Sequence, residues 1–367
     1  MTKRVCHVTS VHKPTDGRIF ERECSSLAKV YDVTLIAPNV DDYEKNRIHV
    51  KGVKLPTSRI KRHKHLGLVL KKMIEVDADV YHFHDPELMP LGLKIKKLGK
   101  RIIFDSHEDV PALILRKTYI PTAFLRKIIS IYFENYEKRA LKKYDAVVSV
   151  TPDIVEKLKR YNSQTYMLTN YPIYREEKHK RSFERKIGFA GLVSANWNLT
   201  TVLEAIKDLD VIFELAGPVS ESFLEQLKAT DGWKKVNYHG VIKHQEVLDM
   251  LSSCSVGLAL EAYDNPNAGG RKGSIGVTKI YEYMHEGVPV IATDLDNWVP
   301  VIAGTESGFC IDPQNSTLLK DKIQYLLNNK EEVIRMGNNG RKAVKEQYCW
   351  QTQETTLFEM YEKVLAE

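Results

Sequence analysis

Short apolar runs alternate along the chain with segments in which apolar residues recur every three to four positions. The runs at residues 5–9 and 146–150 are typical of strands that are buried on both faces of a parallel sheet. After the first run, Ile19, Phe20 and Leu27 share one apolar face of a predicted helix. Strand, loop, helix and strand in this order predict a doubly wound α/β domain.

The alternation is interrupted once and then begins again. Residues 173–186 are charged and aperiodic, and a second series of strand and helix patterns follows them. A chain of 367 residues is long for a single core, so two domains are expected. We place the first domain at residues 1–172, the linker at 173–186 and the second domain at 187–349.

Composition narrows the class of protein. Hydrophobic residues make up 43% and charged residues 28%, as in ordinary globular proteins. The five cysteines show no CxxC spacing, so we expect reduced thiols and no zinc site. Neither a signal-peptide core nor an apolar stretch of the roughly 20 residues that span a bilayer is present. These features predict a cytoplasmic protein.

Residues 277–294 carry the strongest chemical signal. A helical pattern ends at Gly287, Pro289 blocks its continuation, and a short apolar strand follows. Lys279 and Glu282 lie near the start of this helix, at the predicted mouth of a parallel sheet. An ammonium there can bind phosphate, and a carboxylate can accept the hydroxyls of a ribose. The pattern predicts a pocket for a nucleotide sugar.

Polar side chains also close strands of the first domain. One strand ends at His84 and Asp85, and another ends at His107 and Glu108. Ligands bind beyond the carboxyl ends of parallel strands, so we assign these residues to the acceptor side of a cleft. The loop after the first strand adds a candidate helix cap and a cation there, Asp16 and Arg18.

These stretches resemble a known family. The helix KIYEYM at residues 279–284 with GVPVIA at 287–292 resembles the donor-site helix of family-four retaining glycosyltransferases of the GT-B fold. The segments at residues 85–87 and 105–109 resemble the signature of that family's first domain. The resemblance implies two Rossmann-like domains that face each other across a cleft, with a last helix at 350–365 that crosses back to the first domain. It also implies that His107 contacts the transferred sugar, Lys279 neutralises phosphate and Glu282 binds the ribose.

The resemblance implies further donor contacts and shows two departures. The donor contacts are Gly191, Gly217, Arg271, Lys272, Ser274, Thr278 and Tyr281. Ser274 stands where the family commonly has a glutamate, and residues 192–196 lack the usual basic pair. Either the cations at residues 271, 272 and 279 supply the phosphate charge, or catalysis is impaired.

We therefore predict a retaining, metal-independent glycosyltransferase that uses no cofactor. It would move a hexosyl or N-acetylhexosaminyl group from a UDP- or GDP-linked donor to a glycan or lipid-linked acceptor in surface polysaccharide synthesis. Asp294 and Asp296 spell a metal-binding DxD, which we interpret as a chance match. The alternatives are a scaffold subunit that binds nucleotide sugar without turnover, and a GT-B epimerase or hydrolase.

Two basic stretches bear on partners. Residues 59–72 contain no acid, and residues 114–143 mix apolar and basic side chains. A solvated loop and a plain core helix would explain them, but peripheral contact with an anionic membrane surface would also do so. Because no nucleic-acid-binding motif accompanies these stretches, nucleic acid is not an expected partner.

Overall fold

The computed structural model describes residues 2–176, 183–265 and 270–366. The chain forms two compact units, residues 1–170 with 353–367 and residues 171–352. These limits lie within three residues of the predicted limits at 172 and 350. Part of the predicted linker, residues 177–182, falls outside the described residues.

The first unit is built on an eight-stranded sheet with the order β3-β4-β2-β1-β5-β6-β7-β8. Neighbouring strands are parallel except for the edge pair β3 and β4. The central strands are short and apolar because both of their faces are covered. The strands are β1 (Arg4–Val8), β2 (Asp32–Pro38), β3 (Tyr43–Lys45), β4 (Ile48–Val53), β5 (Val80–Phe83), β6 (Arg101–Ser106), β7 (Ala146–Ser149) and β8 (Thr165–Met167).

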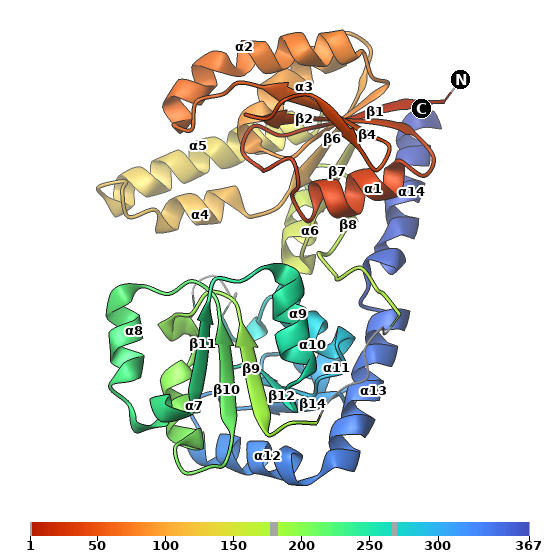
Figure 1. The fold of residues 1–367 in the computed structure, drawn as a ribbon. Helices are drawn as coiled ribbons and strands as arrows, with labels where there is room; N and C mark the ends of the chain where they lie inside the picture. The colour runs from red at the N-terminus through yellow and green to blue at the C-terminus, as the bar shows by residue number, and fades with distance from the viewer. Residues whose placement is uncertain (1, 177–182, 266–269, 367) are drawn as a thin grey trace. The chain divides into compact units, whose positions relative to one another are not determined.

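Helices follow most strands of the first unit (Figure 1), and the π-helix η1 follows β1 after the loop at residues 9–18. The helices are η1 (Ile19–Cys24), α1 (Ser25–Leu27), α2 (Arg59–Val76), α3 (Met89–Lys96), α4 (Val110–Arg116), α5 (Ala123–Leu141), α6 (Pro152–Lys159) and the C-terminal α14 (Trp350–Ala366), with a 3-10 turn, η2 (Pro86–Leu88). In α14, Leu357, Tyr361 and Val364 are buried, and the Tyr361 hydroxyl hydrogen-bonds His82 of β5. The expected return of the last helix to the first domain is confirmed.

The second unit has a six-stranded sheet with the order β11-β10-β9-β12-β13-β14, and all its neighbours are parallel. Its strands are β9 (Lys186–Ala190), β10 (Ile212–Ala216), β11 (Val236–Gly240), β12 (Val256–Ala259), β13 (Val290–Thr293) and β14 (Gly308–Ile311). Its helices are α7 (Leu199–Ile206), α8 (Glu221–Lys228), α9 (His244–Ser252), α10 (Thr278–His285), α11 (Val299–Ile302), α12 (Ser316–Asn328) and α13 (Lys330–Glu346), with 3-10 turns η3 (Ala195–Trp197), η4 (Asp231–Lys235) and η5 (Gly270–Lys272).

Two core clusters cover the two faces of this second sheet. Side chains of α7 and α12 pack with Ile291 on one face, and side chains of α10 and α13 pack with Val290 and Ala292 on the other. The predicted helix stop also holds, because Gly287 adopts φ +67° directly after α10. The fold is therefore the predicted pair of doubly wound α/β units.

No helix in the described ranges combines the length and the apolar character that crossing a membrane requires.

Candidate functional site

The amine of Lys279 is enclosed in the second unit. Lys279 lies in the first turn of α10, and only 8% of the residue is exposed. Its Nζ lies 3.3 Å from the ring centroid of Trp197 and 3.8 Å from that of Phe189. Among the described residues, this nitrogen has no hydrogen-bond partner. Burial lowers the pKa of Lys279 well below its ordinary value, although Glu261 and Glu282 oppose the shift.

Two glycines at the carboxyl ends of neighbouring strands shape the backbone beside this amine. Gly191 follows β9 and Gly217 follows β10, with φ of +139° and +135°. A Cβ on Gly217 would lie 1.7 Å from the carbonyl oxygen of Gly191, and a Cβ on Gly191 would lie 2.9 Å from the Lys279 Nζ. A side chain at Gly217 would clash with the backbone of Gly191, and one at Gly191 would crowd the amine; both positions also have positive φ, so glycine is favoured at each.

Glu282 lies one turn after Lys279 on α10 and is accessible. Its Oε1 lies 3.1 Å from Nε2 of His244 at the start of α9, and its side chain is 20% exposed. Glu261, two residues beyond β12, is buried and acts electrostatically on the lysine. Its Oε1 accepts a hydrogen bond from Asn265, while its Oε2 has no partner in the described part of the chain. Burial raises the pKa of Glu261.

The remaining predicted donor residues divide into accessible and packed ones. Arg271 is exposed, pairs with Asp294 at 3.2 Å and stacks on Tyr263. Thr278, in the first turn of α10, is partly exposed, as is Ser274, whose hydroxyl accepts from Gly276 N. Lys272 lies in the 3-10 turn η5 and is exposed.

Tyr281 has a packing role. The residue is 3% exposed, and its ring packs T-shaped against Tyr171 and tilted against Tyr348 in the core. The structure therefore places this predicted donor contact inside the second unit, away from the amine of Lys279. Residues 266–269 of the predicted glycine-rich loop lie outside the described residues.

In the first unit, His107 lies on a buried ion pair. Its Nε2 is 3.0 Å from Oδ2 of Asp105, the carboxylate that ends β6. Arg18 holds the same carboxylate with two bonds, Nε–Oδ2 at 2.7 Å and Nη2–Oδ1 at 2.9 Å. Burial by itself raises the pKa of Asp105, but Arg18 and His107 outweigh it and hold the pKa well below the ordinary range.

The structure places three of the other predicted acceptor-side residues, Arg18, His84 and Asp85, beneath the surface. Arg18 and His84 are both buried, and His84 Nδ1 lies 3.2 Å from Oδ2 of Asp105. Both residues thus contact the carboxylate that also pairs with His107. His107 itself remains partly exposed, with 21% of its side chain accessible.

The loop after β1 lies beside His107. The Asp16 Oδ1 accepts hydrogen bonds from the backbone N–H groups of Arg18 and Ile19, as a helix cap would do. Asp85 is buried and accepts from the Ser10 backbone, and Glu108 is exposed. The strand ends thus gather the predicted polar residues at one edge of the first sheet, as the topology requires.

Two family profiles together match almost the whole chain. "Glycosyltransferase Family 4" matches residues 17–166, and "Glycosyl transferases group 1" matches residues 170–343. The chain is a family-four glycosyltransferase of the GT-B fold.

Relatives agree with this assignment. A phosphatidyl-myo-inositol mannosyltransferase of Mycobacterium leprae is 28% identical over 81% of this glycosyltransferase and 76% of the relative. A sucrose-phosphate synthase from Thermosynechococcus elongatus has a similar structure, with a TM-score of 0.71, 14% identity and 99% of both chains covered. Anabaena HepE, solved with UDP-glucose, has a TM-score of 0.65 and 12% identity over 98% of this chain and 99% of that chain.

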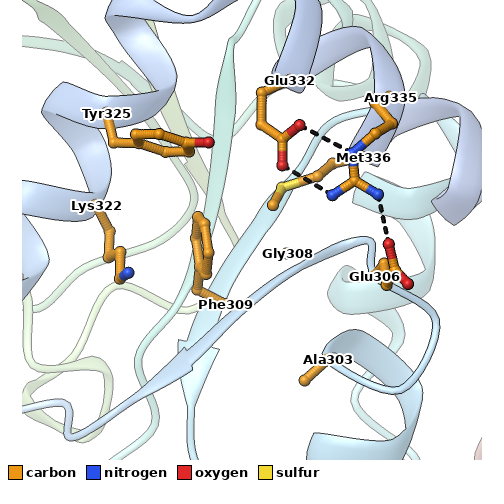
Figure 2. Close-up of a pocket in the computed structure, with 9 residues that line it drawn as sticks. All are labelled: Ala303, Glu306, Gly308, Phe309, Lys322, Tyr325, Glu332, Arg335 and Met336. Atoms are coloured by element: carbon orange, nitrogen blue, oxygen red, sulfur yellow. Dashed lines mark hydrogen bonds and ion pairs between the residues drawn. The ribbon is translucent and has the colours of Figure 1, made fainter.

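One surface hollow of the glycosyltransferase is remote from these groups. It is lined by residues of β14, α12 and α13, and Figure 2 shows Arg335 bonded there to Glu306 and Glu332. Gly308, which lines it, is the first residue of β14, so the hollow lies at the amino end of a parallel strand. Ligands of open α/β sheets bind at the opposite edge, and we do not assign the hollow to the transfer reaction.

Two residues around Lys279 escaped sequence reasoning, Trp197 and Glu261. Asp105 was recognised as an acid at the end of a strand, but its bond to His107 was not predicted. For Glu261 a signal existed, since it is an acid at the end of an apolar strand. For Trp197 there was none, because its contact depends on how a loop folds over α10.

Proposed function

We propose that the enzyme transfers a hexosyl or N-acetylhexosaminyl group from a UDP- or GDP-linked donor with retention of anomeric configuration, and that the transfer needs no metal ion. The observation that carries the proposal is the pair formed by Lys279 and Glu282 on one helix. The first is a buried amine without a hydrogen-bond partner among the described residues, and the second is an accessible carboxylate one turn away. A nucleoside diphosphate offers an anion for the former and ribose hydroxyls for the latter.

The leaving diphosphate gains charge during transfer, and this charge has to be stabilised. The Lys279 amine and the N-terminus of α10 supply positive charge without a metal ion, and Arg271 is exposed nearby in the sequence. These groups would compensate for the lack of basic residues in the loop at residues 192–196. That loop instead supplies Trp197, whose ring must shift from the amine when phosphate binds.

In the first unit, we propose that His107 contacts the transferred sugar. Its Nε2 faces Asp105, which leaves Nδ1 as the nitrogen that would hydrogen-bond a sugar hydroxyl. In retaining transfer of this kind, a departing phosphate oxygen takes the proton of the acceptor, and a flanking pair of carboxylates is not needed. Asp105 is already committed to Arg18 and cannot act as a nucleophile while it is so held.

The test begins with thermal melts of the purified protein against UDP, GDP and their sugars. A ligand that binds only the native state stabilises the protein by about 2.7 kcal/mol when present at 100 times its Kd. A rise in Tm with only one of the two nucleotides would therefore identify the base of the donor. Transfer is then run with and without EDTA, and the anomeric configuration of the product is read by NMR. An inverted product, or activity abolished by EDTA and restored by Mg²⁺, would refute the corresponding part of the proposal.

We further propose that the acceptor is lipid-linked and is met at an anionic membrane surface. The related mannosyltransferase is named for a phosphatidylinositol acceptor. In Figure 1 the hairpin of α4 and α5 projects beyond the first sheet. Its large exposed apolar residues are Leu115, Tyr119, Phe124, Leu125, Ile128, Ile131 and Tyr132. Exposed cations flank them, among them Arg116, Lys127, Lys138 and Arg139.

An apolar strip with flanking cations fits the boundary between headgroups and acyl chains. The second predicted surface, residues 59–72, is the start of α2. There Arg62 is buried against Glu87 while Ile60 is exposed, so only part of its charge faces outward.

Vesicle co-sedimentation tests the surface. Vesicles containing phosphatidylserine should bind the wild type, and Phe124→Ser with Tyr132→Ser should weaken binding about tenfold or more, because two exposed aromatic rings no longer insert. Tyr325→Ser, which removes an exposed ring of the second unit, is the matched control and should bind normally. Equal binding by all three proteins would reject the hairpin as the membrane contact.

A further inference from the structure

A second cluster of polar side chains lies in the first unit, and it shares only His84 with the groups around His107. It consists of His7 on β1, Glu23 on η1, and His82 and His84 at the end of β5. All four are buried, with at most 2% of any residue exposed. One ligand atom from each lies within 4.8 Å of every other.

The sheet itself brings the three imidazoles together. β1 and β5 are parallel neighbours, and His7 is the register partner of His82. His84 follows two positions later and therefore continues on the same side of the sheet. Glu23 of the π-helix η1 lies within 4.8 Å of these imidazoles, measured between the possible ligand atoms.

The four atoms have the spacing of a metal site. Glu23 Oε2 lies 3.7 Å from His7 Nδ1, 3.8 Å from His84 Nε2 and 4.0 Å from His82 Nδ1. His7 Nδ1 and His84 Nε2 are 2.9 Å apart. Ligands at about 2.0–2.1 Å from a tetrahedral ion stand roughly 3.3 Å from one another, and the observed distances bracket that value.

Glu23 is the independent sign that something belongs at the centre. Within the described ranges, neither of its oxygens has a hydrogen-bond partner, although Arg18 Nε lies 3.1 Å from Oε1. Arg18 already forms an ion pair with Asp105, so a single buried cation faces the buried carboxylates of both Asp105 and Glu23. A carboxylate buried with so little compensation is costly, and a cation at the centre of the cluster would offset the cost.

Two of the three imidazoles have the outer contacts of metal ligands, whereas Nε2 of His82 has no hydrogen-bond partner among the described residues. His84 directs its other nitrogen, Nδ1, to the carboxylate of Asp105 at 3.2 Å. His7 directs Nε2 to the hydroxyl of Tyr361 at 3.1 Å. A histidine ligand commonly donates its second N–H to a carboxylate or another oxygen, which fixes its tautomer and orientation.

We propose that His7, Glu23, His82 and His84 bind one divalent transition-metal ion, with Zn²⁺ as the best fit to three nitrogens and one carboxylate oxygen. His82 would exchange its 2.9 Å hydrogen bond to Tyr361 for the ion. Because the site is closed to solvent, the ion would enter during folding and tie β1, η1 and β5 together. This site is distinct from the donor pocket, and the proposal depends on neither the donor nor the acceptor proposed above.

A neighbouring group, His84 with Asp105 and His107, is a weaker candidate. Its Asp105 Oδ2 is already occupied by Arg18 Nε at 2.7 Å, and a guanidinium there repels a second cation.

Metal analysis of the intact protein tests the proposal. The full chain is refolded or expressed with Zn²⁺, dialysed, and measured by mass spectrometry for metal per chain. We expect about one ion per chain that resists dialysis. Glu23→Gln, which keeps the shape and removes the charge, should lower the content severalfold and lower the Tm of the zinc-loaded protein. His65→Ala, which removes an exposed histidine of α2, should leave both unchanged.

Loading with Co²⁺ gives a second readout that needs no variant. A four-coordinate Co²⁺ site has intense visible absorption, whereas an ion held loosely at the surface does not. Wild-type protein without stoichiometric metal and without this absorption would overturn the proposal even if Glu23→Gln fails to fold. The cluster would then be a hydrogen-bonded chain from Asp105 through His84, His7 and Tyr361 to His82. Metal that is lost in His65→Ala but kept in Glu23→Gln would also overturn it.

Discussion

Replacing Lys279 with methionine separates stability from function. The amine is enclosed by Trp197 and Phe189 and has no hydrogen-bond partner among the described residues, so the folded protein carries an unsatisfied buried group. Such a group costs about 1–3 kcal/mol, and the lost contact with the two rings returns about 0.5–2 kcal/mol. Methionine fills nearly the same space without a polar atom.

We therefore expect Lys279→Met to be more stable than the wild type by about 1 kcal/mol in the absence of ligand, a rise of about 2–4 °C in apparent Tm. The same variant should bind nucleoside diphosphate about 10- to 100-fold more weakly, since a charge-assisted contact of about 1.5–3 kcal/mol is lost. Sugar transfer should fall below detection. Lys228→Met, at an exposed lysine on α8, is the matched control and should change none of the three.

Proton uptake gives the reasoning a second check. Burial holds the pKa of Lys279 well below its ordinary value in the free protein, and a bound phosphate would raise the pKa again. Between these two values, nucleotide binding takes up a proton, which calorimetry in buffers of different ionisation enthalpy measures. The reasoning is refuted if Lys279→Met melts lower than the wild type and binds UDP and GDP as well, or if both proteins take up the same number of protons.

Two further substitutions probe other groups. Glu282→Gln should weaken nucleotide binding about 10-fold or more in calorimetric titration, because a charged acceptor for the ribose hydroxyls is lost. Glu286→Gln, at the end of the same helix, is the control and should bind nucleotide normally. Equal affinities of the two variants would contradict the ribose role of Glu282. Burial raises the pKa of Glu137 in α5 from 4.5 to about 7, so the folded protein holds this proton more tightly than the unfolded chain. The stability that this proton confers is fully present below about pH 4.5 and is lost as the pH rises to about 7. In urea titrations, Glu137→Gln should therefore be as stable as the wild type at about pH 4.5. At pH 8 it should be about 1–3 kcal/mol more stable than the wild type. A gain that is independent of pH would rule out ionisation as its cause.

The fold was predictable because its signals are local and repeated. Buried parallel strands need apolar runs, and helices between them need one apolar face, so the order of elements is written along the chain. The end of α10 near Gly287 and the buried strand that follows it were also predictable from the sequence. Position after a strand predicted that His107 lies at the edge of the first sheet, because parallel topology sends the carboxyl ends of strands to one edge, and the helical pattern placed Lys279 in the first turn of α10.

The depth of each side chain was not predictable in the same way. Arg18, His84 and Tyr281 were expected at a ligand surface, and all three are buried. Arg18 is drawn inward by Asp105, which is 87 positions away in the sequence. The pattern of one segment cannot reveal a partner that arrives from another strand, so a polar residue at a strand end indicates an edge of the sheet but not a surface.

The two units use buried charge in different ways. In the first, Arg18, Asp105 and His107 form bonds that satisfy one another, and such a network holds His107 in one orientation before any ligand arrives. In the second, Lys279 has aromatic rings around it where a counter-ion would be expected, and its nearest carboxylates, Glu261 and Glu282, do not bond it. A group left unsatisfied in this way lowers the stability of the empty protein and so strengthens the binding of an anion that satisfies it. The unsatisfied amine is thus a better guide to the donor site than the satisfied network is to the acceptor site.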